Sequence, residues 1–214
     1  MDSQTFLKAV SDGDRAAVAE ALAANPSLAN ERSPDGASAI QRAVYYGCSE
    51  LVEDILAAGA EVDLATACTI GKSLPPDFDP NELSADGFRP IALAAAFGHN
   101  GIVRILLAKG ADPNLPSTAL GAVPPLQSAV FGRNLEAVRL FVEAGAEVDA
   151  KQQGGFTALM GASQNGDAEM VRYLLASGAN PHLLDNGNKS AADWAANEEV
   201  RATLTGTAGA PPAQ

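Results

Sequence analysis

The chain has 214 residues, 47% of them apolar, which is enough for one large or two small folded domains. It carries 26 acidic and 14 basic residues, a formal net charge of −12. This excess of negative charge argues against DNA, RNA or an anionic membrane as a partner, and it is compatible with a basic protein partner.

The amino-terminal stretch MDSQTFLKAV has neither a basic start nor a long apolar run, so we expect no secretory signal. No window reaches the roughly 18 apolar residues that a membrane-spanning helix needs. Cys48 and Cys68 are too few for a disulfide framework; they are expected to be buried thiols, with a single bridge as the alternative. These features predict a protein of the cytoplasm.

A repeating pattern begins with the first predicted helix, near Ser3. Each of five valines is preceded by an alanine nine residues earlier. The valines are Val18, Val52, Val103, Val138 and Val171, and the alanines are Ala9, Ala43, Ala94, Ala129 and Ala162. A sixth alanine, Ala195, follows, and the successive alanine spacings are 34, 51, 35, 33 and 33 residues. A fixed period near 33 predicts a repeat protein.

Each unit predicts the same local structure. A turn with glycine or asparagine, such as Asp35-Gly36 or Asp86-Gly87, precedes a short alanine-rich helix that usually ends at another glycine. A second helix follows with apolar residues at positions i, i+3 and i+4 and a further glycine after it. One such pair of helices has too little core to fold alone, so the pairs are expected to stack.

Two units depart from the pattern. The 51-residue spacing contains residues 62–71, which read as a first helix without a preceding hairpin, and then residues 72–87, where Pro75, Pro76 and Pro80 prevent a second helix. We therefore expect a truncated, irregular repeat near 62–85. In a later unit Arg133 stands where the other first helices are followed by glycine, and that helix end is expected to be irregular.

The carboxy-terminal unit, around 188–204, has charged residues suited to a solvent-facing cap. The tail 206–214 is rich in small residues, glycine and proline and is expected to be disordered. The predicted organisation is thus one domain over 1–205, with about five full helix pairs, a partial repeat and a cap.

The pattern resembles the ankyrin repeat over about residues 3–204. It shares the period, the hairpin tips, the paired helices and the G-A-x-x-N ending, as in Gly110-Ala111 to Asn114. The family's Thr-Pro-Leu-His is eroded: the segments are SAIQ (38–41), RPIA (89–92), PPLQ (124–127), TALM (157–160) and SAAD (190–193). The resemblance implies an all-α repeat solenoid of stacked helix-turn-helix units. It also implies a non-enzymatic adaptor or regulator that binds a protein through the concave surface of hairpin tips and first helices.

The register of the resemblance places candidate partner-binding residues on that surface. Aromatic residues dominate the set, as they do at many interfaces. Phe88 and Phe156, which follow tip glycines, are expected to project outward, and acidic tips would select a basic partner. The candidates are Asp35, Tyr45, Tyr46, Asp86, Phe88, Phe97, Phe131, Phe156, Gln164 and Asn165.

Little in the sequence indicates catalysis, and we predict no catalytic residue, metal ligand or cofactor. His99 and His182 lack neighbouring acids or cysteines at metal-ligand spacing, and GKS (71–73) lacks the upstream glycine of a phosphate-binding loop. Three alternatives stay open: an inhibitor of a partner enzyme, an enzyme that uses the 72–85 loop with its acidic residues, and a self-assembling structural protein. A monomer is expected for an adaptor of this kind.

Overall fold

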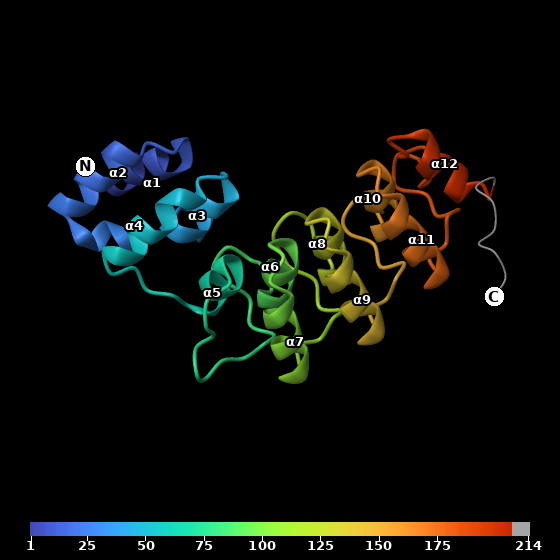
Figure 1. Ribbon diagram of the computed structural model, residues 1–214, viewed down its shortest axis with the longest axis horizontal. Helices are drawn as coiled ribbons and strands as arrows, with labels where there is room; N and C mark the ends of the chain where they lie inside the picture. Colours follow the sequence, from blue (N-terminus) through green and yellow to red (C-terminus); the bar gives the residue numbers. More distant parts are fainter. Residues whose placement is uncertain (207–214) are drawn as a thin grey trace. The chain divides into compact units, whose positions relative to one another are not determined.

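The computed structural model describes residues 1–206, and the part of the predicted tail beyond them lies outside it (Figure 1). Regular structure in these residues consists of helices and two isolated β-bridges, Arg32 with Ser38 and Lys151 with Thr157. The chain divides into two compact units, Met1–Pro90 and Ile91–Gln214, which are described separately below.

The first unit contains two helix pairs and a single helix. Its helices are α1 (Ser3–Asp12), α2 (Arg15–Ala24), η1 (Pro26–Asn30), α3 (Ala39–Tyr45), η2 (Ser49–Leu51), α4 (Val52–Ala57) and α5 (Leu64–Ile70). Helix α1 packs on α2 and α3, and α3 packs on α4 and α5. The core between them includes Phe6, Val10, Val18, Ile40, Leu51 and Ile55, all of which are fully buried.

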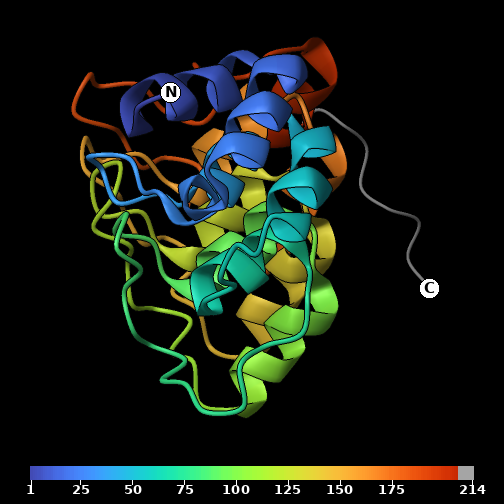
Figure 2. The same cartoon turned by 90° about the vertical axis from the view of Figure 1, so that its left-hand side faces the viewer.

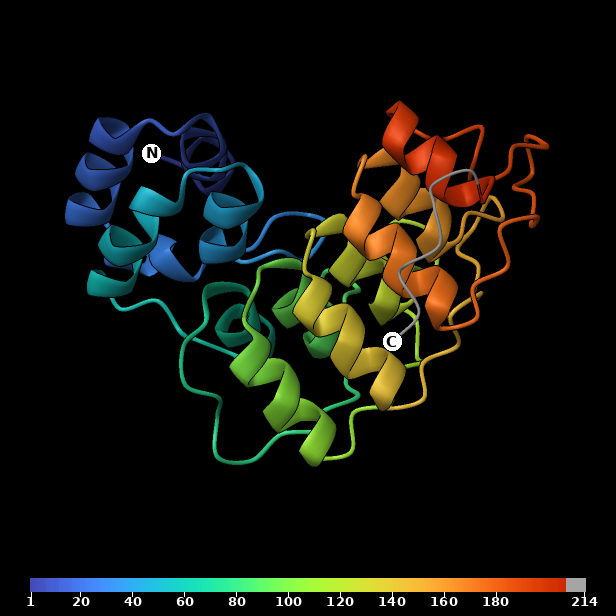
Figure 3. The same ribbon diagram turned by 45° about the vertical axis from the view of Figure 1, so that its right-hand side comes forward.

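The second unit continues with three helix pairs and a last helix. They are α6 (Pro90–Ala96), which begins at the unit boundary, α7 (Asn100–Ala108), α8 (Pro125–Phe131), α9 (Leu135–Glu143), α10 (Ala158–Gln164), α11 (Ala168–Ala176) and α12 (Glu198–Leu204). Helices α8 and α10 pack side by side, α9 contacts α7, and α11 contacts α12. Figure 3 shows α7, α9 and α11 as one row. In Figure 2 the hairpins of this unit gather on one side of its helices.

The alanines and valines at the 33-residue spacing explain why the helix pairs fit together. The alanines Ala43, Ala94, Ala129 and Ala162 are all fully buried in first helices, and Ala67 is buried in the same way in α5. An alanine side chain allows the neighbouring helix to approach closely, and a larger residue would force the helices apart. Four of the five regularly spaced valines, Val18, Val103, Val138 and Val171, are also fully buried, on the second helices. The 33-residue period is therefore the period of the core.

The helix end at Arg133 is regular, contrary to the expectation from the sequence. The glycines after the other first helices, Gly13, Gly47, Gly71, Gly98 and Gly166, adopt φ between 70° and 82°. Arg133 adopts φ 53°, in the same left-handed region, although its side chain makes that conformation costly. The adjacent Gly132 has a different role, because a Cβ on it would collide with the carbonyl of Ala96.

Candidate functional site

Two hairpin tips of the first unit have the same sequence pattern, Ser-x-Asp-Gly, and the same hydrogen bonds. In residues 33–37 the Ser33 amide donates to the Ala37 carbonyl at 2.9 Å, and the Ser33 hydroxyl donates to Asp35. In residues 84–88 the Ser84 amide donates to the Phe88 carbonyl at 2.9 Å, and the Ser84 hydroxyl donates to Asp86. The sequence thus builds two matched tips, each with a carboxylate held by a serine.

The second tip lies directly against the first and against α3. A Cβ on Gly36 would collide with the backbone carbonyl of Ala85, so the backbones of the two tips touch. The tip 84–88 therefore occupies the place next to the first tip that the hairpin of the truncated repeat would fill. Helix α5 lacks a hairpin of its own, as predicted, and the chain supplies one from a later segment.

Three of the candidate residues come together at this contact. The Tyr45 hydroxyl donates to Asp86 Oδ2 at 2.8 Å, and Gln41 Nε2 donates to the same oxygen at 3.3 Å. The rings of Tyr45 and Phe88 meet edge to face with centroids 6.1 Å apart. Burial and the nearby Asp86 carboxylate raise the pKa of Tyr45, which keeps the hydroxyl protonated as a donor. Tyr45, Asp86 and Phe88 thus bind one another.

Asp35 and Tyr46 lie open to solvent in the same unit. The hydrogen bond from the Ser33 hydroxyl lowers the pKa of Asp35, so this exposed tip keeps a carboxylate. Tyr46 is 58% exposed, and the guanidinium of Arg42 lies over its ring, 5.0 Å from the centroid. These two side chains are available to a partner in a way that Tyr45 and Asp86 are not.

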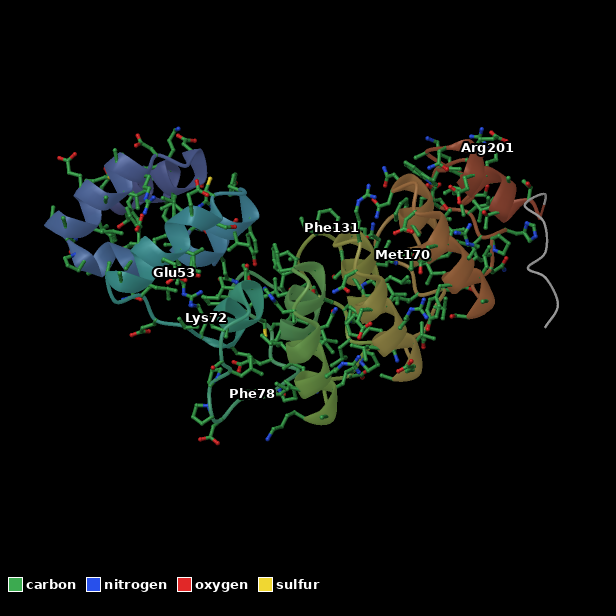
Figure 4. The ribbon with its side chains drawn as sticks, viewed as in Figure 1. Glu53, Lys72, Phe78, Phe131, Met170 and Arg201 are labelled. Atoms are coloured by element: carbon green, nitrogen blue, oxygen red, sulfur yellow. The ribbon has the colours of Figure 1, made fainter. Side chains whose placement is uncertain are left out.

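In the second unit the most exposed candidate is Phe131, at the end of α8 (Figure 4). It is 84% exposed, which is unusual for a phenylalanine in a folded protein. Gln164 occupies the equivalent place on α10 and is also exposed. The next residue, Asn165, is half-buried and donates through Nδ2 to the Val130 carbonyl at 2.8 Å.

The other phenylalanine candidates, Phe88, Phe97 and Phe156, are all half-buried. Phe156 does not project outward as expected, because its ring packs edge to face on Trp194 with centroids 5.2 Å apart. Phe88 differs from the expectation in the same way through its contact with Tyr45. Phe97, at the end of the α6 segment, is likewise only partly accessible.

The sequence reasoning missed Leu120, which is 82% exposed in the hairpin before α8. Leu120, Gly121 and Ala122 are three consecutive residues with positive φ. A signal was present in the sequence: Pro124 lies ten positions after Asn114, whereas Thr157 lies eight positions after Asp149 at the equivalent place. The two additional residues lengthen this tip, and Leu120 lies within it.

Glutamines make the contacts between repeats that the missing histidines would make in the family. Gln127 Nε2 donates to the carbonyls of Ala150 and Phe156, both at 2.9 Å, and so joins α8 to the following hairpin. Gln41 makes the corresponding contact with Asp86. Gln127 Oε1 is buried without a hydrogen-bond partner among the described residues.

The acidic residues of the 72–85 loop do not form a metal centre. Asp77, Asp79 and Glu82 are exposed, and no group of three or more His, Cys, Asp or Glu residues in 1–206 is placed to hold a metal ion. Burial raises the pKa of the Cys68 thiol to about 12, so this cysteine is not a reactive thiolate. Nor is any helix among these residues long and apolar enough to cross a bilayer.

Comparisons with known proteins agree with this architecture. A family model described as ankyrin repeats (3 copies) matches residues 65–152, 94–185 and 126–205. The mouse "Ankyrin repeat and SAM domain-containing protein 6" is 34% identical over 103 residues, covering 46% of this chain and 12% of that protein. A "Putative ankyrin repeat-containing protein" of Treponema pallidum (strain Nichols) is 32% identical over 124 residues, covering 57% of this chain and 41% of that protein. The chain thus spans less than half the length of these two relatives.

The crystal structure of the ankyrin repeat domain of Bcl-3 has the same fold. It superimposes with a TM-score of 0.59 at 24% sequence identity, and the match covers 94% of this chain and 97% of that one. The helix pairs and hairpins described above are therefore those of a known fold.

Proposed function

The chain belongs to the ankyrin-repeat family, and from this premise we propose that it is a non-enzymatic adaptor or regulator that binds a protein partner. Ankyrin repeats are protein–protein interaction modules, and a rigid stack of helix pairs presents side chains that the core does not need. We further propose that the protein acts in the cytoplasm as a monomer; light scattering at increasing protein concentration tests the monomer.

The observation that supports a particular surface is the exposure of Phe131. Phe131 and Leu120 belong to the same repeat, the first on its first helix and the second in its hairpin. The stretch 115–131 contains no charged residue, although the chain as a whole has a large net charge. Exposed aromatic and aliphatic side chains in a neutral surrounding are suited to an apolar patch of a partner.

Backbone strain in the same repeat supports this assignment. Leu120, Ala122 and Arg133 all have positive φ, a conformation that costs a non-glycine residue on the order of 1–2 kcal/mol. Strain of this kind is concentrated at functional sites. Arginine is also a residue type enriched in protein interfaces, and Arg133 is exposed next to the end of α8.

The first unit offers a surface of different chemistry. Met1–Pro90 contains 15 acidic and 6 basic residues, a net charge of −9, whereas the second unit has a net charge of −3. Asp35 and Tyr46 are the exposed candidates there. We propose that they contact a basic part of the partner, with the carboxylates accelerating association.

Affinity capture tests the proposal. Phe131→Ala and Leu120→Asn are each expected to reduce, by at least tenfold, the amount of the partner that wild type captures. An aromatic anchor contributes about 2 kcal/mol or more to binding. Asparagine is chosen at position 120 because it tolerates the left-handed backbone. Phe131 and Leu120 are preferable to Phe88 and Phe156, whose loss would remove ring contacts and destabilise the fold.

The matched control is Ile105→Ala. Ile105 is an apolar residue of the same unit, 48% exposed, but it lies on a second helix, α7, away from the proposed surface. It should capture the same protein as wild type. Equal capture by Phe131→Ala and Ile105→Ala would refute the assignment of the surface.

A further inference from the structure

The segment 72–88, which replaces the second helix of the truncated repeat, is attached to the rest of its unit near both ends. At its start, Lys72 Nζ forms an exposed ion pair with Glu53 of α4 at 3.2 Å (Figure 4). At its end, Asp86 accepts hydrogen bonds from Tyr45 and Gln41 of α3. We call this segment the strap.

The two attachments differ in strength. An exposed lysine–glutamate pair contributes little, because water and salt screen it. The Asp86 contact is partly buried, involves an ionised acceptor and combines a hydrogen bond of 2.8 Å with a ring contact. Gln41 Nε2 also donates to the Tyr45 hydroxyl at 3.2 Å, so Gln41, Tyr45 and Asp86 form one hydrogen-bonded group that connects α3 to the strap.

A detached tip would not keep its structure. The bonds inside 84–88 are those of a single short hairpin, and such a hairpin is marginal in water unless it packs on something else. Loss of the Tyr45–Asp86 bond therefore weakens the attachment of the tip, which Gln41 and the close approach to Gly36 then hold only in part, and lets its amides exchange with solvent more often. The matched tip 33–37 has its own β-bridge, Arg32 with Ser38, and does not depend on Tyr45 in this way.

We propose that the strap is a conformational device: it completes the truncated repeat by supplying the missing hairpin, and the Tyr45–Asp86 contact is the clasp that holds it closed. Opening the clasp uncovers the end of α3 that carries Tyr45, so the first unit has a closed and an open surface. Tyr45 and Asp86 are positioning residues in this device.

Amide hydrogen exchange resolved by NMR tests the clasp. The amides of Ser84 and Gly87 donate to the Phe88 and Ser84 carbonyls, both at 2.9 Å, and report the tip. In Tyr45→Phe their exchange should rise about tenfold or more, the factor expected for losing a hydrogen bond to a charged group. The Ser33 and Gly36 amides make the equivalent bonds in the matched tip and should keep their wild-type rates.

Two variants serve as controls, and a third completes a double-mutant cycle with Tyr45→Phe. Tyr46→Phe removes an exposed hydroxyl one residue away, and Asp35→Asn changes the matched carboxylate, and neither should alter the exchange of Ser84 and Gly87. Asp86→Ala should raise it at least as much as Tyr45→Phe does, because it also removes the bonds from Gln41 and Ser84. The double variant should add little to Asp86→Ala alone, because the Tyr45 bond is already absent there.

Three results would overturn the proposal. The first is wild-type exchange at Ser84 and Gly87 in Tyr45→Phe. The second is an equal rise at Val18, a core amide of α2, which would mean that the whole unit and not the strap was destabilised. The third is an additive double variant. None of these measurements uses a partner, so they are independent of the capture experiment.

Discussion

At the scale of single residues, the start of α8 carries a defect that α3 does not have. Ser38 directly precedes α3, and its amide donates to Gln41 Oε1 at 2.9 Å. Pro124 holds the equivalent place before α8 with nearly the same backbone, φ −62° against −68°, but proline has no amide hydrogen. The absent donor explains why Gln127 Oε1 is buried and unpaired.

Pro124→Ser should therefore stabilise the protein. It supplies the amide for Gln127 and a hydroxyl that can cap the helix, a gain of about 1–2 kcal/mol, reduced by about 0.4–1 kcal/mol for the more flexible unfolded chain. Urea unfolding measures the difference. Pro34→Ser, at an exposed proline in a tip, isolates the entropic loss and should be slightly destabilising. A Pro124→Ser variant no more stable than Pro34→Ser would contradict the explanation.

At the scale of elements, the asparagine that ends a repeat fixes the register of the next one. Asn114 accepts from the Glu147 amide at 2.8 Å and donates to the Gly145 carbonyl at 3.1 Å. Asn30 accepts in the same way from the Glu61 amide at 2.7 Å. Asp63, which ends the repeat before α5, instead caps α5 through the Thr66 amide, because no second helix follows with a glycine loop to bind.

Asn114→Ala should cost about 1–2 kcal/mol of unfolding free energy, since it removes two bonds between neighbouring repeats and leaves a backbone amide and a carbonyl without them. Asn180→Ala is the matched variant: that side chain accepts only from the His182 amide of its own repeat among the bonds described for it. Urea titration should place Asn180→Ala closer to wild type. The reverse order would show that the bonds between repeats carry no stability.

These elements also show how far the sequence could be used for prediction. The alanine and valine spacing gave the helix pairs and the truncated repeat correctly, because a regular period directly reflects a regular core. It could not give the pairing of Tyr45 with Asp86, which are 41 residues apart and meet only because a later hairpin fills an earlier place. Leu120 was missed because its exposure depends on loop length and backbone conformation, not on a pattern of residue types.

At the scale of the whole molecule, the negative charge is unevenly distributed between the two units. The first has a net charge of −9 and the second of −3. Exposed ion pairs connect successive second helices in both units, Arg15 with Asp54 in the first and Arg104 with Glu136 in the second. Salt screens both repulsion and attraction, so it should act differently on the two units.

Raising the salt concentration should stabilise the first unit more than the second. Both units have exposed ion pairs, but the unbalanced negative charge, and so the repulsion that salt screens, is larger in the first. The amides of Val18, Val138 and Val171 measure this, since each is buried at an equivalent place and donates to a carbonyl four residues earlier. Protection at Val18 should increase more between about 0.01 M and 1 M salt, where the Debye length falls from roughly 30 to 3 Å. An equal increase at all three would show that the charge difference does not affect folding.

The contact between Phe156 and Trp194 has a practical consequence. Trp194 is the only tryptophan of the chain, and its indole nitrogen donates to Asp185 at 2.9 Å. Its ultraviolet emission therefore reports on the carboxy-terminal repeat and on no other. A denaturation curve followed by that fluorescence, compared with one followed by circular dichroism, would reveal whether this end of the protein melts before the rest without any label being attached.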